Sequence, residues 1–309
     1  MTTPETSAVR ARLERLVDGL SAPLRDTVRG LVERPGKQLR STMLAACAGF
    51  GEADPGRVAR LGAVVELVHL ASLVHDDVID RAAVRRGRPA AHREAGTELA
   101  LLAGLACLGA AGAEAAELGE DVSVPVSRTI AELTHGELLD VERGFDVTLS
   151  LPDYVELVRR KTGALFELSC LLGAAEARLG RPARTALAAF GREFGIAFQI
   201  MDDCWDLTAA GADKPVGTDQ LLGLFGAPTL SALRADDSGR LGELLLSPGF
   251  SVADLAEVRE LVTGLGGITA ARELAGVHYR KALSALAAAP GRPAGAALRA
   301  IAEKVWGEP

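Results

Sequence analysis

The sequence predicts an all-α protein, and three observations support this fold class. Ala and Leu, which both favour helices, dominate the 309 residues. Aromatic residues make up only 4%, and the β-branched and aromatic runs typical of strands are scarce. Apolar residues recur at helical spacing along almost the whole chain. With 48% hydrophobic and 24% charged residues, the composition is that of a folded globular protein.

The helical spacing predicts helices, in chain order, over residues 5–19, 38–50, 56–81, 94–117, 122–141, 152–178, 183–208, 226–235, 252–264, 268–288 and 293–305. Gly, Pro or acidic residues separate them, as in Arg34-Pro35-Gly36 and Gly180-Arg181-Pro182. No Gly/Ser-rich linker divides the chain. We therefore expect one domain over residues 1–309, with a peripheral N-terminal helix in residues 1–20.

Charge and cysteine content exclude several classes of protein. A net charge of −7 and a pI near 5.4 argue against nucleic-acid binding, which needs a basic surface. The four cysteines form no CxxC pair, as expected for buried thiols in a reducing compartment. The longest uncharged stretch, Leu99–Ala113, is shorter than the ~20 apolar residues of a membrane span. With a polar N-terminus, these features predict a soluble cytoplasmic protein that does not span a membrane.

Two predicted helices end in the same acidic pattern, DDxxD. Its aspartates are Asp76, Asp77, Asp80, Asp202, Asp203 and Asp206. At 100° per residue, His69 shares one helix stripe with Asp76 and Asp80. Gln199 lies within one turn of both Asp202 and Asp203. Negative charge at a helix C-terminus opposes the helix dipole and costs a few tenths to ~1 kcal/mol per charge, so its repetition indicates a bound cation.

The cation expected at these carboxylates is Mg²⁺, which proteins bind through a few carboxylates together with substrate phosphates. The expected substrate is a diphosphate. Two unit charges ~4 Å apart interact by roughly 4 kcal/mol at an effective dielectric of 20. Carboxylates would therefore repel a diphosphate unless divalent ions lay between them.

Basic residues accompany both acidic segments. Lys37 and Arg40 are predicted on the first turn of a helix, where anions bind well. Arg85 and Arg86 follow the first acidic segment. The remaining candidates are Lys161-Thr162, in the middle of a predicted helix, and Lys214, after the second acidic segment.

Together these residues resemble the all-trans isoprenyl (polyprenyl) diphosphate synthase family. The resemblance extends from about Leu31 to the C-terminus. Its motifs are Gly36-Lys37-Gln38-Leu39-Arg40, His69 to Asp80, Arg85-Arg86-Gly87-Arg88-Pro89, Gly136-Glu137, Lys161-Thr162-Gly163, Phe198 to Asp206 and Lys214-Pro215-Val216-Gly217-Thr218-Asp219. It implies a bundle of antiparallel helices around a central cavity, the isoprenoid synthase type I fold, and a homodimer.

The resemblance also implies a role for each motif residue. The six aspartates would hold Mg²⁺, three ions in the family pattern, on an allylic diphosphate. The residues implied to contact this diphosphate, or the charge that develops near it, are Arg85, Lys161, Thr162, Gln199 and Lys214. The residues implied to bind isopentenyl diphosphate are Lys37, Arg40, His69 and Arg86.

The implied reaction is ionisation of the allylic diphosphate, attack by the double bond of isopentenyl diphosphate, and loss of a proton. Ser72 is one turn before Asp76, with Ala71 beside it. Short-chain members of the family place aromatic residues there as a floor. Because both residues are small here, we expect a product longer than 15 carbons.

The chain departs from the family pattern at three positions. Leu105 stands where the family usually has Asp, Asp213 where it has Gly before the motif Lys, and Leu224 where it has Lys. The basic C-terminal tail of the family is mostly absent. These departures put substrate closure and turnover in question.

Three other functions remain open. A terpene cyclase also uses DDxxD and Mg²⁺, but the paired cations favour a second diphosphate substrate. A non-catalytic regulatory subunit of a prenyl synthase is the second alternative, although intact acidic segments favour catalysis. Glu66-x-x-His69 and Glu132-x-x-His135 match the ExxH motifs of di-iron carboxylate bundles. That last reading leaves both DDxxD segments unexplained.

Overall fold

The computed structural model describes residues 4–33, 36–85, 88–208, 217–289 and 292–307. The first half contains α1 (Pro4–Asp18), α2 (Ala22–Val32), α3 (Leu39–Ala48), α4 (Pro55–Ile79), β1 (Val84–Arg85), β2 (Arg88–Pro89), α5 (Ala91–Ala95), α6 (Thr97–Leu118) and α7 (Glu120–Glu142). The second half contains α8 (Leu151–Val158), the π-helix η1 (Arg159–Gly163), α9 (Ala164–Glu176), α10 (Arg181–Thr208), the 3₁₀-helix η2 (Thr218–Leu222), α11 (Ala227–Ala235), α12 (Arg240–Leu245), the 3₁₀-helix η3 (Val252–Asp254), α13 (Leu255–Gly264), α14 (Gly267–Ala287) and α15 (Arg292–Gly307).

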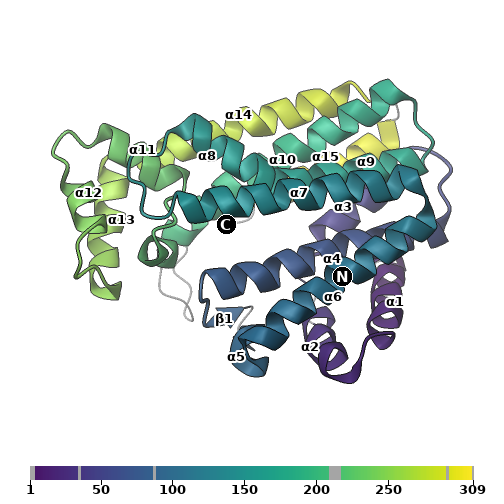
Figure 1. Cartoon of the computed structure of the whole chain (residues 1–309). Helices are drawn as coiled ribbons and strands as arrows, with labels where there is room; N and C mark the ends of the chain where they lie inside the picture. The colour runs from purple at the N-terminus through teal and green to yellow at the C-terminus, as the bar shows by residue number, and fades with distance from the viewer. Residues whose placement is uncertain (1–3, 34–35, 86–87, 209–216, 290–291, 308–309) are drawn as a thin grey trace.

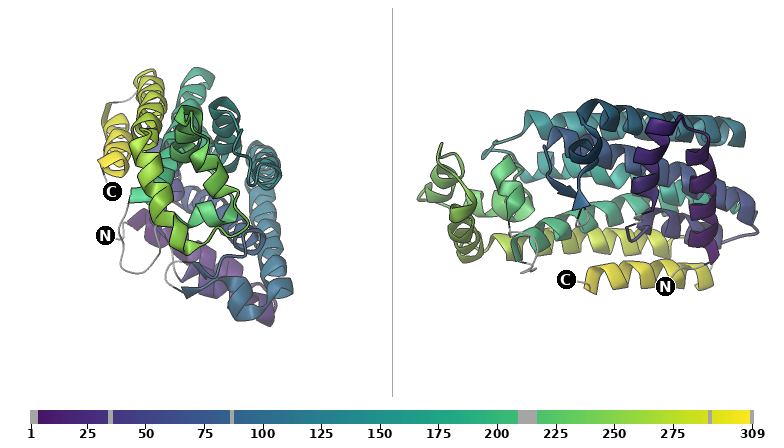
Figure 2. Two further views of the ribbon diagram at one scale, coloured as in Figure 1. Left: turned by 90° about the vertical axis from the view of Figure 1, so that its left-hand side faces the viewer. Right: turned by 90° about the horizontal axis from the view of Figure 1, so that it is seen from below.

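The long helices α4, α7, α9, α10 and α14 run side by side along one direction, and α6 crosses them at an angle (Figure 1). The helices α11, α12 and α13 lie at one end of this bundle, whereas α1 and α2 pack near the other end (Figure 2). The two strands form only a short antiparallel ribbon beyond the end of α4. The acidic ends of α4 and α10 both lie toward the end of the bundle that carries α11.

The helix α4 forms the centre of the largest core cluster. It packs against α1, α3, α6 and α9. It is apolar around most of its circumference, which is typical of a helix buried on all sides. A second cluster joins α10 to α11, α13 and α14, and a third joins α3 to α9, α10 and α15. The two acidic segments therefore end helices that are fixed by different parts of the core.

The predicted helices are confirmed, with several differences. The range 152–178 is continuous but contains the π-helix η1. The helices α2 and α12 and the short strands were not predicted, although Ser21 and Pro23 are start signals for α2. The helix α3 begins at Leu39, so Lys37 precedes the helix, contrary to its predicted place on the first turn.

The predicted peripheral N-terminal helix contributes to the core. In α1, Val9, Leu13 and Val17 are buried. Arg12 and Arg60 both donate hydrogen bonds to the buried carboxylate of Glu114 on α6. This shared partner connects α1 and α4 to α6.

Two helices, α4 and α6, are long and apolar enough to cross a membrane by length and composition alone. The most apolar stretch of α4 is 67% buried within the protein, as expected for a core helix. That of α6 is only 39% buried. Part of the α6 surface is therefore apolar and uncovered.

Close contact between α7 and the π-helix η1 depends on Gly136. A Cβ at this position would lie 2.5 Å from the backbone nitrogen of Lys161. We expect Gly136→Ala to lower the free energy of unfolding by about 1–3 kcal/mol, as overpacking does. Gly30→Ala in α2, where a Cβ meets nothing within 4 Å, is the control and should be neutral or slightly stabilising. Urea unfolding measures both; equal effects would contradict the predicted role of Gly136.

Candidate active site

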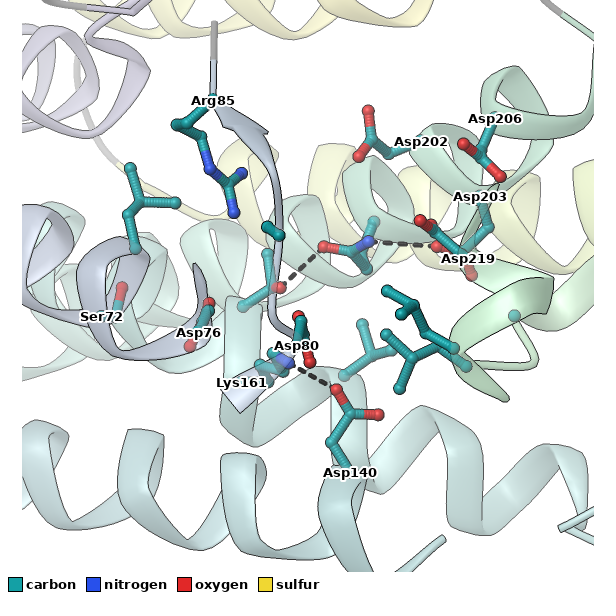
Figure 3. Close-up of a pocket in the computed structure, with 18 of the residues that line it drawn as sticks. Ser72, Asp76, Asp80, Arg85, Asp140, Lys161, Asp202, Asp203, Asp206 and Asp219 are labelled. Atoms are coloured by element: carbon teal, nitrogen blue, oxygen red, sulfur yellow. Dashed lines mark hydrogen bonds and ion pairs between the residues drawn. The ribbon is translucent and has the colours of Figure 1, made fainter. Parts of the chain in front are cut away.

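A cavity of about 1160 Å³ separates the two acidic segments. Asp76 and Asp80 line one side, and Asp202 and Asp206 line the opposite side (Figure 3). The cavity wall also contains the residues implied to contact substrate: Lys37, Arg40, His69, Arg85, Lys161, Thr162 and Gln199. The structure therefore brings together most of the residues that the sequence singled out.

In the first acidic segment, the middle aspartate differs from its neighbours. Asp77 is buried, and its carboxylate accepts a hydrogen bond of 2.7 Å from Nε of Arg85. This ion pair joins the end of α4 to β1. Asp76 and Asp80 instead face the cavity, on the stripe predicted for them and His69.

The second acidic segment differs in part, because its middle aspartate, Asp203, also lines the cavity. The side chain of Asp203 accepts hydrogen bonds from Tyr154 Oη, from Gln199 Nε2 at 3.0 Å and from the backbone N–H of Ala227 at 3.2 Å. Asp202 is exposed to the cavity. Protein donors therefore hold Asp203, the middle aspartate.

In the first acidic segment, burial and neighbouring negative charges disfavour ionisation of Asp76 and Asp80. Burial is the main cause that raises the pKa of Asp76 to about 8, with Glu137 and Asp80 adding to it against the opposing effect of Lys161. Burial likewise raises the pKa of Asp80 to about 6, again opposed by Lys161. A bound cation would lower both pKa values because it stabilises the charged carboxylates.

Lys161 is the cation that lies among these carboxylates. Its Nζ forms ion pairs with Asp140 and, at 2.8 Å, with Glu137. Burial, the largest influence, lowers the pKa of Lys161, but the charges of Asp140, Asp76 and Glu137 together raise it above its ordinary value. Lys161 is therefore fully charged at neutral pH.

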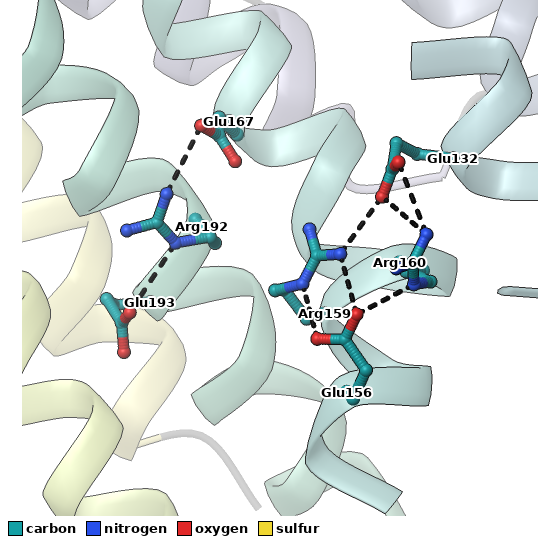
Figure 4. A network of polar contacts seen from close by, with 7 residues as sticks. All are labelled: Glu132, Glu156, Arg159, Arg160, Glu167, Arg192 and Glu193. Atoms are coloured by element: carbon teal, nitrogen blue, oxygen red, sulfur yellow. Dashed lines mark hydrogen bonds and ion pairs between the residues drawn. The ribbon is translucent and has the colours of Figure 1, made fainter. Parts of the chain in front are cut away.

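The direction of Lys161 follows from the π-helix η1. Its two preceding neighbours, Arg159 and Arg160, form ion pairs with Glu132 and Glu156 in a separate network (Figure 4). The extra residue in a π-turn rotates the side chains that follow it, and such turns are frequent at functional sites. Lys161 and Thr162 consequently line the cavity, whereas Arg159 and Arg160 remain in the other network.

A second basic group lies in another part of the cavity wall. Arg40 Nη1 lies 3.1 Å from Nε2 of His69, and its guanidinium stacks 4.5 Å above the ring of Phe166. Lys37, which precedes α3, also lines the cavity. Arg40 on α3 and His69, about two turns before Asp76 on α4, thus form a basic group set back from the acidic end of α4.

The two predicted chain-length residues have different surroundings. Ser72 lines the cavity one turn away from Asp76, and its hydroxyl donates a hydrogen bond of 2.9 Å to the backbone oxygen of His69. Ala71 belongs to the core around α4 and is not among the residues that line the cavity. Only Ser72 is therefore placed to meet a ligand.

Several predicted residues and departures can now be located. Arg86, Asp213 and Lys214 lie outside the residues that the structure describes. Leu224 lines the cavity where the family has a lysine, so the wall is apolar there. Leu105 is on the surface of α6, away from the cavity.

Sequence reasoning missed four residues of this site: Glu137, Asp140, Tyr154 and Asp219. Glu137 and Asp140 are three residues apart, which places them on one face of the predicted helix 122–141. Asp219 lines the cavity and ends a motif that was quoted only for its lysine. No local pattern marked Tyr154.

Comparison with known proteins places this geometry in a family. The model of the polyprenyl synthetase family matches residues 21–262. The chain belongs to this family. It is a prenyltransferase, and the predicted all-α fold of the isoprenoid synthases is confirmed.

Individual polyprenyl synthetases match nearly the whole chain. Heptaprenyl diphosphate synthase component 2 of Geobacillus stearothermophilus is 33% identical over 96% of this chain and 94% of its own length. Nonaprenyl diphosphate synthase of Mycobacterium tuberculosis is 33% identical over 96% and 92%. A Caulobacter crescentus polyprenyl synthase, solved with calcium and isoprenyl diphosphate, superposes with a TM-score of 0.93 at 29% identity, covering 98% of this chain and 94% of that one.

The donor set of this polyprenyl synthetase fits a divalent cation shared with a diphosphate. Among the described residues, no three His, Cys, Asp or Glu side chains converge closely enough to hold a metal ion alone. The cavity-facing carboxylates instead stand in two groups on opposite walls. Mg²⁺ is typically held by one or two carboxylates together with substrate phosphates, which matches this arrangement.

The di-iron alternative is not supported by the same geometry. Glu66 accepts hydrogen bonds from the backbone and hydroxyl of Ser41. Glu132 forms ion pairs with Arg159 and Arg160, far from the acidic ends of α4 and α10. Each ExxH glutamate is therefore bonded to other protein groups.

The raised pKa of Asp76 gives a prediction for the metal-free protein. Because the folded state resists ionisation of Asp76, this group costs stability increasingly as the pH rises from about 4 to 8. Asp76→Asn should therefore stabilise the protein at pH 8.5 by roughly 1 kcal/mol or more, since one pKa unit corresponds to ~1.4 kcal/mol. The gain should shrink toward pH 4.

Asp77→Asn is the matched control, because this neighbour forms an ion pair with Arg85 and should destabilise when neutralised. Denaturant unfolding in the presence of a chelator, at pH 8.5 and near pH 4, measures the change in the free energy of unfolding that each variant causes. Equal signs for the two variants at pH 8.5 would contradict the assignment.

Proposed function

We propose that this polyprenyl synthetase is a Mg²⁺-dependent, head-to-tail prenyltransferase. It condenses isopentenyl diphosphate with an allylic diphosphate and releases an all-trans polyprenyl diphosphate of C20 or longer. The observation that carries the proposal is one cavity with carboxylates on two opposite walls and a separate basic group, Arg40 with His69, away from the acidic end of α4. Two anionic substrates can be bound there side by side.

The proposed metal residues are Asp76 and Asp80 on one wall and Asp202 and Asp206 on the other. When bound, Mg²⁺ would neutralise the diphosphate and stabilise its departure as a leaving group. Arg85 and Lys161 add positive charge at the same end of the cavity. We propose that Lys214 also contributes, as the family motif implies.

The condensation itself needs little from protein side chains. As the allylic C–O bond breaks, negative charge on the diphosphate is balanced by Lys161 and Arg85. Oxygens of Thr162 and Gln199 face the positive carbon chain. The double bond of isopentenyl diphosphate, held by Lys37, Arg40, His69 and Arg86, forms the new C–C bond. The proton then passes to the released diphosphate, so no side-chain base is required.

This arrangement favours a synthase over a terpene cyclase. A cyclase binds one diphosphate, whereas Arg40 and His69 form a basic group distinct from the acidic walls. A solely regulatory subunit is also less well supported, because the cavity keeps both acidic walls and Lys161. We place the protein in the cytoplasm, where its four free, buried cysteines suit a reducing environment.

The direct test is incubation with radiolabelled isopentenyl diphosphate, Mg²⁺ and each allylic diphosphate in turn, followed by product sizing. We expect products of C20 or longer and no reaction in a chelator. Asp76→Asn should lower kcat about a hundredfold or more, as loss of an electrostatic group does. Absence of elongation with every allylic substrate would refute the synthase proposal.

Ser72 offers a test of product length. Ser72→Phe should fill the cavity below Asp76 and shorten the product, because the growing chain would meet the ring. Ser72→Ala changes only the hydroxyl and should leave the product distribution unaltered. Chromatography of dephosphorylated products measures both. An unchanged length in the Phe variant would show that the chain grows elsewhere.

We propose that the protein is a homodimer formed through α6. Leu101, Leu102 and Leu105 are 41%, 52% and 61% exposed on one face of this helix. The face continues along α6 through the exposed, uncharged residues Gly109, Gly112, Ala113 and Ala116. Contiguous apolar surface of this kind marks interfaces.

Substitution of the α6 face tests the homodimer. The double variant Leu102→Glu/Leu105→Glu should be monomeric in light scattering, because charges would be buried in the interface. Val252→Glu, at a 57% exposed apolar residue of η3, is the control and should remain dimeric. A monomeric wild type would instead favour a different partner subunit, as the name of the Geobacillus relative, component 2, suggests for that protein.

A further inference from the structure

We propose that Asp203 does not bind metal but positions Gln199, with Tyr154 as its anchor. This inference rests on the proposed function, because it concerns the charge that develops during condensation. The DDxxD pattern by itself assigns the same role to all its aspartates. Asp203 is held by three donors of the protein, and these contacts indicate a role of its own.

The carboxylate of Asp203 is engaged on both oxygens by protein donors. Oδ2 accepts from the hydroxyl of Tyr154 and from the backbone N–H of Ala227, and Oδ1 accepts from Nε2 of Gln199. Tyr154 is itself buried, on α8. The surroundings are tight, since a Cβ at Gly226 would lie 2.3 Å from Oδ2. These three donors occupy most of the roughly four lone-pair sites of the carboxylate, so little of it is left for a metal ion.

The carboxylate fixes which way the amide of Gln199 points. The NH₂ group of Gln199 faces Asp203, because its Nε2 donates to Oδ1 at 3.0 Å. The amide oxygen is then left to face Thr162, whose hydroxyl donates to it at 2.9 Å. These contacts join Thr162 to Asp203 through Gln199, and all three residues line the cavity. Oxygen atoms, rather than N–H groups, are therefore turned toward the cavity, where they suit a positively charged carbon chain.

The first acidic segment uses its middle aspartate in the same manner. Asp77 is buried and paired with Arg85, which holds that arginine at the cavity wall. The middle aspartate of each segment is thus bonded to a protein donor, although Asp203, unlike Asp77, also lines the cavity. A positioning role for the middle aspartate therefore recurs on two separate helices.

Asp203→Asn is the decisive variant, because it keeps the shape and changes one oxygen to NH₂. With Tyr154 and Ala227 donating to the remaining oxygen, the new NH₂ would face Nε2 of Gln199 and turn its amide around. We expect kcat to fall about tenfold to a hundredfold, the range for residues that orient others. Tyr154→Phe should act in the same direction with a smaller loss.

Metal binding is measured separately, by electron paramagnetic resonance of free Mn²⁺ titrated with protein and inorganic diphosphate. Asp203→Asn should bind Mn²⁺ as the wild type does. Asp202→Asn, the matched control, should bind it more weakly. Weakened Mn²⁺ binding in Asp203→Asn, with an unchanged melting temperature, would overturn the proposal. This Mn²⁺ titration needs no turnover, so it still decides the role of Asp203 if no substrate is elongated.

A double-mutant cycle tests whether Asp203 acts through Gln199. In a Gln199→Ala background, Asp203→Asn should cause no further loss of kcat, because the amide that it orients is gone. Losses that multiply would show that Asp203 acts independently and would overturn the positioning role. The melting temperatures of all variants are compared at the same pH, so that a folding defect is recognised as such.

Discussion

The burial of several carboxylates around one cavity is the constraint on which the rest of this structure depends. The ends of α4 and α10 bring aspartates to opposite walls, and on the α4 side burial, together with the nearby Glu137 and Asp80, disfavours ionisation of Asp76. Lys161 offsets part of this charge from within the protein. Divalent cations shared with a diphosphate would neutralise the remainder. The unfavourable ionisation of Asp76 and Asp80 and the proposed affinity for a divalent cation thus have one cause.

The surrounding helices hold these charges at fixed positions. Each acidic helix is anchored in a different core cluster, so the two walls cannot relax toward each other as side chains of one helix could. Gly136 allows α7 to approach η1 closely, and the π-turn then directs Lys161 inward while Arg159 and Arg160 remain in the network with Glu132. Packing thereby decides which of these three adjacent basic residues lines the cavity.

The polar and apolar parts of the cavity have different roles in the proposed reaction. Charged residues gather at the ends of α4 and α10, and Arg40 with His69 forms a second polar group on the α3 side. Ser72 lies one turn below Asp76, and the family lysine position carries Leu224. Apolar walls suit a prenyl chain and exclude the water that would intercept a reactive cation.

The sequence by itself determined the features that depend on local periodicity. One helical repeat was enough to place His69, Asp76 and Asp80 on a single stripe, and composition was enough to predict an all-α fold. Only the tertiary structure decided which partners each aspartate meets. Asp203 meets Tyr154, a residue 49 positions earlier in the chain, and no local pattern encodes such a contact between distant segments. The same pattern, DDxxD, therefore contains residues of two kinds, which the packing of α4 and α10 against their neighbours distinguishes.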